Sequence, residues 1–380
     1  MRHAIAALLL PLALIGCTLG DDGGDDYHAR LLQQYRSALP TAKRLESGVP
    51  TPGNQPGALA LEADSEIARL AINAAVGVNV PAAQMVLVLK VVTDLPPTLY
   101  DSETREFVWG PWPNDDGVGD VVVTIRENDE DDDFRYSYAF GRLMGRDIAT
   151  AEPIIAGGAT PDPDDPDLGV GVTVWDMQMN NAFDEANDPD FDPDAPRDEG
   201  RLAMLYGAGN DGGEDYYFNV AVLRDFVGKD AEPDEQPADA DVFYGSTHLD
   251  GVALNFLDCV IEGDVCDATA DSCFENDSVD DADETFSFRA AFLGTAGRGE
   301  AQISGGDLTS DLAVVECWDT MLETTYFSVD DGSTSLTEGS CGGNENVTLA
   351  ESGVPTLDQV DAELMDALDC VASNGFEACE

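Results

Sequence analysis

The chain has 380 residues, 43% of them hydrophobic, so it can bury a substantial core as one large domain or two smaller ones. Its 76 acidic residues far outnumber its 18 basic residues, and the formal net charge is −58. The electrostatic field of such a negative charge repels phosphates, which excludes nucleic acid as a partner and disfavours anionic lipid surfaces. Only Lys43, Lys90 and Lys229 are lysines, and the composition resembles the acidic, lysine-poor surfaces of salt-adapted proteins.

Residues 1–16 have the layout of a secretory signal peptide, with a short positive head before an apolar run. The run, 4–16, is too short for a membrane-spanning helix, which needs about 20 apolar residues. Residues 14–17 (LIGC) resemble the lipobox of bacterial lipoproteins, in which the cysteine is lipidated, the leader is cut before it and the new N-terminus is acylated. The resemblance implies a lipid anchor on Cys17. The alternative is an ordinary export signal that contains a cysteine.

Residues 17–26 follow as a Gly- and Asp-rich tether with no apolar periodicity. Fully extended, this tether reaches about 30 Å. Enterobacterial lipoproteins with an Asp directly after the lipidated cysteine stay in the inner membrane, whereas this chain has Thr18 there. The resemblance therefore implies an outer-membrane location in the cell envelope.

Two helices are predicted before any strand. An amphipathic helix is indicated over 27–39 by apolar residues at helical spacing, namely Leu31, Leu32, Tyr35, Ala38 and Leu39. A second helix is expected to start at Pro81, a residue favoured in the first turn, and to stop before Pro96. Its apolar residues surround the axis, which predicts burial on all sides. Because the run is β-branched, a strand is the alternative.

From Gly117 onward the apolar period changes to two, which predicts a hairpin of residues 121–126 with 135–140. The same pattern recurs in four further pairs of segments and in residues 169–179, giving about ten or eleven strands. The pairs are RLAMLY with YYFNVAVL, DVFYGS with VALNFL, TFSFRAAF with EAQISG, and LAVVECW with TTYFSV. We therefore predict an α+β, mainly β fold over 27–350: a large curved antiparallel sheet or half-barrel packed on one or two N-terminal helices.

The seven cysteines other than Cys17 lie in the last third of the chain and lack the CxxC spacing typical of metal sites. Disulfides persist in the oxidising compartments that an export signal implies. Local pairing is predicted for Cys317 with Cys341, for Cys370 with Cys379, and for Cys259 with either Cys266 or Cys273. Because seven is odd, one thiol remains unpaired.

The order of segments resembles a family of uncharacterised envelope lipoproteins from myxobacteria. The matching pieces are LPPTLYDSETREFVWGPWP, then paired strands, then SGGDL, VVECWDTMLETTYF and a downstream GSC, covering about Leu31 to Cys341. The resemblance implies export, β architecture and the Cys317–Cys341 bridge, and it leaves the function open. The tail, 351–380, is extra relative to this pattern. In the tail, Thr356 and Gln359 have the spacing of a capping box that starts a short helix.

Two acidic loops supply oxygen ligands of the kind that calcium prefers. One is PDPDDPDLG from Pro161, and the other is NDPDFDPDAPRDE from Asn187. In the second loop, the spacing of the first three ligands and of the twelfth ligand of a calcium loop is matched by Asp188, Asp190, Asp192 and Glu199. Pro193 and Asp194 stand where that loop needs a freely turning Gly. The alternative is a solvated acidic loop stiffened by proline.

Three functions are consistent with these patterns. The first is a lipid-anchored envelope protein with a non-catalytic binding or structural β domain, attached to the membrane by its N-terminal lipid and free to bind an envelope protein partner. The second is a carrier of an apolar ligand in a half-barrel cavity between the sheet and the helix from Pro81. The third is a hydrolase that uses paired carboxylates. No cofactor other than calcium is indicated.

Overall fold

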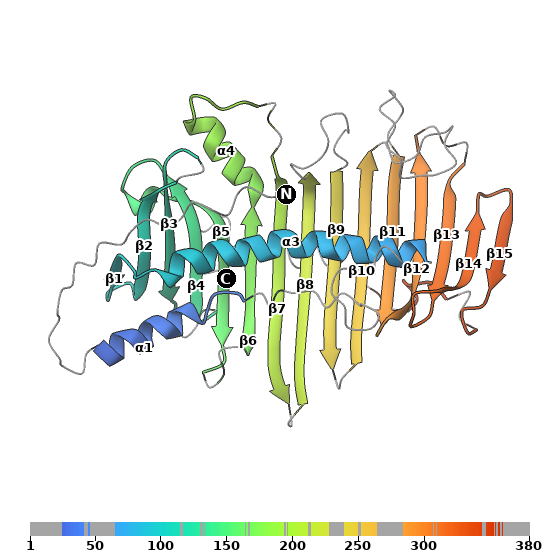
Figure 1. Ribbon diagram of the computed structural model, residues 1–380, viewed down its shortest axis with the longest axis horizontal. Coiled ribbons are helices and arrows are strands. Elements are labelled where there is room, and N and C mark those ends of the chain that lie inside the picture. Colours follow the sequence, from blue (N-terminus) through green and yellow to red (C-terminus); the bar gives the residue numbers. More distant parts are fainter. Residues whose placement is uncertain are drawn as a thin grey trace.

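The computed structural model describes residues 25–359 except 42–44, 46–64, 115–116, 130–131, 133, 164, 166–167, 194, 196, 212–213, 228–238, 250–251, 264–283, 307, 309, 344–346, 353, 355 and 358. Within these residues the chain forms one open, fifteen-stranded antiparallel sheet and three α-helices, which confirms the predicted mainly β fold. The sheet is a meander, because neighbouring strands in the sheet are also neighbours in the sequence (Figure 1).

The strands follow the chain from one edge of the sheet to the other. They are β1 (Leu99–Asp101), β2 (Glu106–Pro113), β3 (Asp120–Glu127), β4 (Tyr136–Leu143), β5 (Glu152–Pro161), β6 (Gly169–Asp176), β7 (Glu199–Asp211), β8 (Glu214–Val227), β9 (Asp239–Leu249), β10 (Val252–Gly263), β11 (Glu284–Leu293), β12 (Ala296–Gly305), β13 (Leu312–Trp318), β14 (Thr324–Asp330) and β15 (Ser335–Gly339).

All five predicted hairpins are present, as the pairs β3 with β4, β7 with β8, β9 with β10, β11 with β12, and β13 with β14. Four strands were not predicted: β1, β2, β5 and β15. In β5, Gly157 interrupts the apolar pattern, yet a Cβ there would lie 2.3 Å from the ring of Tyr138 on the paired strand. A glycine is therefore needed at this position, because the ring of Tyr138 lies over it.

The helix α3 (Glu66–Asp94) lies across one face of the sheet and spans most of its width (Figure 1). The prediction of a helix is confirmed, but the predicted start at Pro81 is wrong. The helix begins fifteen residues earlier, after Ser65, whose hydroxyl accepts a hydrogen bond from the backbone N–H of Ala68 at 3.2 Å. An interior proline lacks an N–H and costs about 3 kcal/mol, so packing along the sheet must offset that cost.

The main core lies between α3 and the sheet. The sheet-facing side of the helix is buried, including Ile72, Met85 and Leu89, against strand residues such as Tyr138 and Tyr206. Contact is close: a Cβ on Gly299 of β12 would lie 2.2 Å from the side chain of Ile67. The opposite side of α3 is exposed, so the prediction that the helix is buried all round is wrong. The helix covers the sheet as an outer layer.

The N-terminal helix α1 (Asp25–Arg36) packs on the same face of the sheet, beside the C-terminal end of α3. The Tyr35 hydroxyl donates to the carbonyl of Arg105 at 2.8 Å, and its ring packs edge-on against Phe107. The Arg36 guanidinium donates to the carbonyl of Leu95, the C-cap of α3, at 2.9 Å. The predicted first helix is thus confirmed, and it is joined to the C-terminal end of α3.

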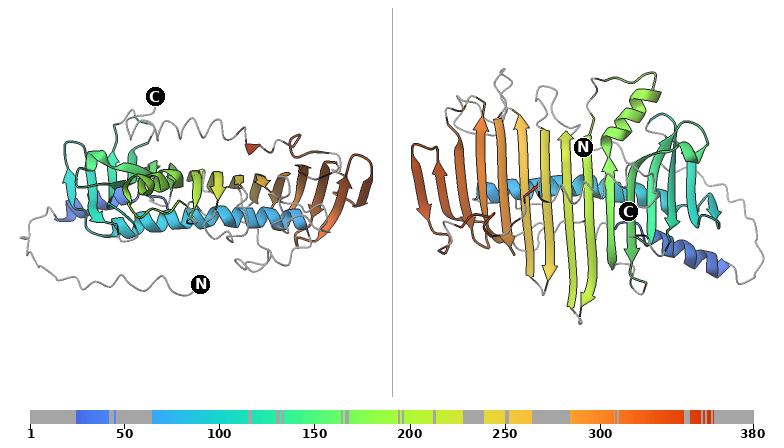
Figure 2. Two further views of the ribbon diagram at one scale, coloured as in Figure 1. Left: turned by 90° about the horizontal axis from the view of Figure 1, so that it is seen from above. Right: turned by 180° about the vertical axis from the view of Figure 1, so that it is seen from behind.

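The other face of the sheet is partly covered by the segment after β15 (Figure 2). Leu357 packs on Val174, Ala203, Val222 and Phe243, and its N–H donates to the Asp258 carboxylate at 2.7 Å. The predicted capping box is confirmed, because Thr356 N–H donates to Gln359 Oε1 at 3.0 Å and Gln359 N–H donates to Thr356 Oγ1 at 3.3 Å. The remainder of the predicted tail helix lies outside the described residues.

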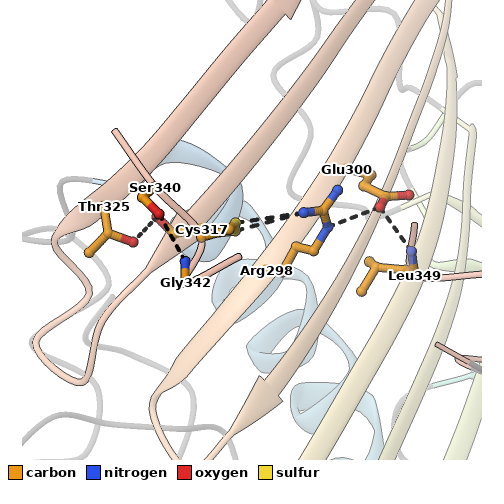
Figure 3. Close-up of a disulfide and its surroundings, with 8 residues drawn as sticks. Arg298, Glu300, Cys317, Thr325, Ser340, Gly342 and Leu349 are labelled. Atoms are coloured by element: carbon orange, nitrogen blue, oxygen red, sulfur yellow. Dashed lines mark hydrogen bonds and ion pairs between the residues drawn. A yellow bond between two sulfur atoms is a disulfide. The ribbon is translucent and has the colours of Figure 1, made fainter. Parts of the chain in front are cut away.

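The predicted disulfide between Cys317 of β13 and Cys341 is present, with the two Cα atoms 5.7 Å apart. The bridge fastens the chain after β15 back to β13. Arg298 Nη1 lies 3.9 Å from the Cys317 sulfur and 3.6 Å from the Cys341 sulfur, while its Nε pairs with Glu300 (Figure 3). Glu300 also accepts from the N–H of Leu349 at 2.8 Å, so this cluster holds the start of the tail against the sheet.

Cys259 is a free, buried thiol, so its predicted pairing is wrong. It lies in the middle of β10, opposite Val242 and Phe288, and its side chain belongs to the core beneath α3. In that position the thiol is buried in the core. Cys17, Cys266, Cys273, Cys370 and Cys379 lie outside the described residues, and the predictions made for them stay predictions.

Candidate binding site beneath helix α4

The helix α4 (Met177–Asn187) was not predicted and stands at one end of the strands, directly after β6 (Figure 1). The predicted strand over 169–179 ends at Asp176, which has two functions. Its Oδ1 caps the helix by accepting from the N–H of Met179 at 2.8 Å, and its Oδ2 pairs with Arg201 Nε of β7 at 2.8 Å. The turn from strand to helix is thereby fixed to the neighbouring strand.

A buried arginine holds α4 against the sheet. Arg142 of β4 pairs with Asp184 at 2.8 Å and donates to Asn180 Oδ1 at 3.0 Å, and both partners are on α4. Its guanidinium also donates to the carbonyl of Val118 at 2.6 Å and lies 4.5 Å from the centre of the Phe183 ring. A buried arginine of this kind fixes geometry, because loss of the Asp184 carboxylate would leave a buried positive charge without its counter-charge.

The acidic loop after α4 folds around its own arginine. Arg197 packs over the ring of Phe191, with 4.0 Å from the guanidinium carbon to the ring centre. It donates to the carbonyl of Ala195 at 3.0 Å and also to the carbonyl of Asp192. Backbone carbonyls that would otherwise be available to a cation are therefore occupied by a guanidinium.

The predicted calcium ligands are not brought together. Asp188 is the C-cap of α4 and accepts from the N–H of Asp190 at 2.9 Å, while Glu199 opens β7. Among the described residues, no group of three or more His, Cys, Asp or Glu side chains is arranged to hold a metal ion. The loop lacks the freely turning glycine of a calcium loop, and its turns are held by local hydrogen bonds and by Arg197.

A pocket of about 250 Å³ lies between α4 and the end of this loop. It is lined by Trp175, Met177, Asn180, Asn181, Asp184, Arg197 and Asp198. Asn181 Nδ2 donates to the carbonyl of Asp198 at 3.0 Å and so closes the loop over the helix. The volume lies just below the range of roughly 300–1,000 Å³ usual for small-molecule sites, which limits a ligand to one small ring or a short chain.

The lining supplies one aromatic side chain, Trp175, together with groups that donate and accept hydrogen bonds. Two carboxylates, Asp184 and Asp198, are matched by the guanidinium of Arg197 in the wall and by that of Arg142 behind Asp184. Balanced charges and convergent polar groups suit a neutral polar ligand better than an ion. No Ser, Cys, His or Lys side chain is among the pocket-lining residues that the structure describes.

An apolar ligand between the helix and the sheet would have to enter a layer of buried side chains in the described part of the chain. The large side chains of the sheet interdigitate with small residues of α3, including Ala68, Ala71 and Ala75, all of which are buried. By length and composition α3 could cross a membrane, and 39% of its most apolar stretch is buried within the protein.

Comparisons of the chain with protein-family models, with curated proteins and with solved structures find no match. The acidic loop near this site stood out in the sequence, but the site itself did not. A usable signal was the motif WDMQMNNAFDEAN, in which Asp176 is a favoured helix N-cap residue and Asn180, Asn181 and Asp184 recur at helical spacing.

Proposed function

We propose that this protein is a lipid-anchored protein of the bacterial cell envelope whose folded domain binds a ligand without chemically changing it. The lipobox at Cys17 and the acidic tether after it support the anchor. The broad sheet with its covering helix supports a scaffold, and the pocket beneath α4 supports a binding role. We propose that the outer membrane carries the anchor, since Thr18 replaces the Asp of the retention pattern.

The single observation that carries the binding role is the pocket lining. An indole face beside paired amides, carboxylates and a guanidinium is suited to a small neutral molecule rich in hydroxyl groups, such as a sugar or polyol. Hydroxyls accept from the guanidinium and amide N–H groups and donate to the carboxylates. An anionic ligand is disfavoured by the net charge of −58.

Tryptophan fluorescence can test the binding role, with a panel of neutral monosaccharides and short polyols as probes. Trp109 and Trp318 are buried, so changes on addition of a probe report mainly on the less buried indoles, Trp175 included. We expect saturable binding that Asp198→Asn weakens at least about tenfold, corresponding to roughly 1.4 kcal/mol. Asp190→Asn is the matched control, because it removes one charge from the same loop at an exposed position outside the pocket.

Failure of every probe to change the spectrum, or equal effects of the two variants, would contradict the binding role. The anchor is tested separately. Mass spectrometry of the N-terminal peptide should find Cys17 acylated, and Cys17→Ser should abolish acylation and leave the precursor uncleaved. Normal membrane attachment of the Cys17→Ser protein would contradict the lipoprotein proposal.

A second candidate function is hydrolysis, because Asp184 and Asp198 line one pocket beside an aromatic side chain. Asp184 is already engaged by Arg142, which favours a structural function for this carboxylate. Assays with nitrophenyl glycosides distinguish the two functions. Turnover that both Asp184→Asn and Asp198→Asn abolish would favour the hydrolase, whereas binding without turnover favours the proposed function. The apolar carrier is the third candidate, and no described cavity favours it.

A further inference from the structure

The side of α3 that faces away from the sheet carries a stripe of exposed apolar side chains. Val76, Val80, Leu87 and Val91 are 43%, 52%, 60% and 51% exposed, respectively. Their spacings of four, seven and four residues place them in one line along the helix. We call these four residues the outer face of α3. They are the same kind of residue as the buried side of the helix, yet they point into solvent.

The outer face is free of charge as far as Leu89, in a chain that is strongly charged elsewhere, and the exposed Lys90 lies beside Val91 at its C-terminal end. Residues 70–89 contain no Asp, Glu, Lys or Arg, although a quarter of the chain consists of these residues. Charged pairs lie only at the two ends of the helix: Glu66 with Arg69, and Lys90 with Asp94 at 2.7 Å. Helices that lie in the plane of a membrane surface likewise bury an apolar face at the lipid boundary, and in α3 the opposite face, which is charged in such helices, is packed on the sheet.

The arrangement of the elements would let a flat surface reach this stripe. Seen along the sheet, α3 forms a layer on one side, with the strands behind it (Figure 2). The helix α1 packs on that same side through Tyr35, which belongs to the same core as α3. Since α1 begins at Asp25, it starts only eight positions after Cys17, a span of at most about 27 Å.

We infer that the outer face of α3 rests on the lipid bilayer to which Cys17 is anchored, with the plane of the sheet parallel to the membrane. This inference rests on the proposed anchor for its orientation. The inference calls for a zwitterionic bilayer surface, because the net charge of −58 would oppose approach to anionic lipids. The same charge opposes a second copy of this chain as the occupant, since two such copies would repel each other.

The test places one new tryptophan on each side of the sheet in the full-length acylated protein. Val80→Trp adds an indole to the outer face of α3. Val170→Trp is the matched control, because Val170 is 43% exposed and shares the alternation of Val174, which packs on the opposite face of the sheet. Both proteins are bound to phosphatidylcholine vesicles with and without brominated acyl chains, which quench nearby indoles.

We expect brominated lipid to remove most of the fluorescence added by Val80→Trp and to leave that added by Val170→Trp unchanged. Adding Leu87→Asp to the Val80→Trp protein should restore the fluorescence without changing the melting temperature, because both side chains are exposed. Equal quenching of the two indoles, or quenching of neither in vesicle-bound protein, would overturn the inference while the anchor proposal stands.

Two further outcomes separate the alternatives. A blue shift of the Val80→Trp emission that grows with protein concentration in the absence of lipid, together with a dimer in sedimentation, would assign the outer face to a second copy and overturn the inference. If Cys17 proves not to be acylated, the anchor proposal fails, and excess vesicles are added to the unacylated protein. Selective quenching of the Val80→Trp indole then still supports the inference, and its absence overturns it.

Discussion

The carboxylate of Glu316 accepts a hydrogen bond from the hydroxyl of Ser65 at 2.7 Å, although 251 residues separate the two in the chain. The same oxygen accepts from the backbone N–H of Ile67 at 2.8 Å. Glu316 lies on β13 and is buried, while Ser65 is the N-cap of α3. A negative charge at the positive end of a helix is stabilising, so this contact fixes both the position and the direction of α3 on the sheet.

Glu316→Ala should lower the free energy of unfolding by about 3 kcal/mol, because it leaves buried donors at the helix N-terminus without an acceptor. Glu316→Gln should cost about 1 kcal/mol, since the amide oxygen still accepts but carries no charge. Urea denaturation measures both values. Glu338→Gln, at an exposed position of β15, is the control and should change little. Equal stability of the Glu316→Ala protein would show that this contact does not seat the helix.

Replacing both Cys317 and Cys341 by Ser should lower the free energy of unfolding by about 3 kcal/mol, as expected for a bridge that closes a loop of 24 residues. Because the bridge fastens the chain after β15 to β13, hydrogen exchange should accelerate first in β14 and β15. Peptide mapping of the oxidised wild-type protein provides the direct check. Recovery of both cysteines as free thiols from freshly isolated, alkylated protein would refute the pairing.

Cys259 should resist alkylation in the native protein at pH 8. Burial raises the pKa of its thiol, and the nearby carboxylates of Asp258 and Asp241 raise it further, so the reactive thiolate is scarce. Iodoacetamide labelling followed by peptide mapping should find this cysteine modified only after denaturant is added. Rapid labelling under native conditions would mean that β10 opens locally or that the thiol lies outside the core.

Glu106→Gln should stabilise the protein at neutral pH. Burial raises the pKa of Glu106, and the positive charge of Arg126 offsets only part of this effect. A raised pKa means that the folded state binds the proton more tightly than the unfolded state does. The stabilisation that results from this binding is present at low pH and is lost as the pH rises. The difference in melting temperature between variant and wild type should be largest near pH 7 and should shrink below about pH 4. A difference independent of pH would contradict this assignment.

Stability should rise with ionic strength. With a net charge of −58, many carboxylates lie within a Debye length of each other, about 30 Å at 0.01 M salt and about 8 Å at 0.15 M. Salt screens this repulsion in the folded state, and the melting temperature across a sodium chloride series measures the effect. Calcium and magnesium should act equally at the same ionic strength, because Asp188, Asp190, Asp192 and Glu199 form no site. A flat series would contradict the repulsion argument.

The sheet could be predicted because its signals are local. In each hairpin the apolar alternation and the turn residues lie within about twenty positions, as in residues 121–140, and the strands pair with their sequence neighbours. The capping box at Thr356 and Gln359 is local in the same sense. The start of α3 was missed because the local signal at Pro81 favours a helix start, while the contact that fixes the true start comes from Glu316.

The pocket could not be predicted from the sequence for a similar reason, because the contacts that form it join residues that are distant in the chain. Trp175 continues an alternating strand pattern, which hid the turn into α4 at Asp176. Arg142 looks like an ordinary strand residue until the fold places it under Asn180 and Asp184. The acidic loop attracted a calcium prediction because its carboxylates are conspicuous in sequence, whereas the interaction that organises it comes from the single guanidinium of Arg197.

The order of elements also has a consequence for biosynthesis. A chain that emerges from its N-terminus presents α3 before any strand exists, and the partner of Ser65 follows 251 residues later. At about 5–20 residues per second, this delay is roughly 10–50 s. During this delay the strands are made one after another, and the uncharged stretch 70–89 lacks the complete sheet against which its apolar side chains are buried. The nascent protein therefore presents a long hydrophobic segment that chaperones can bind until β13 has been made.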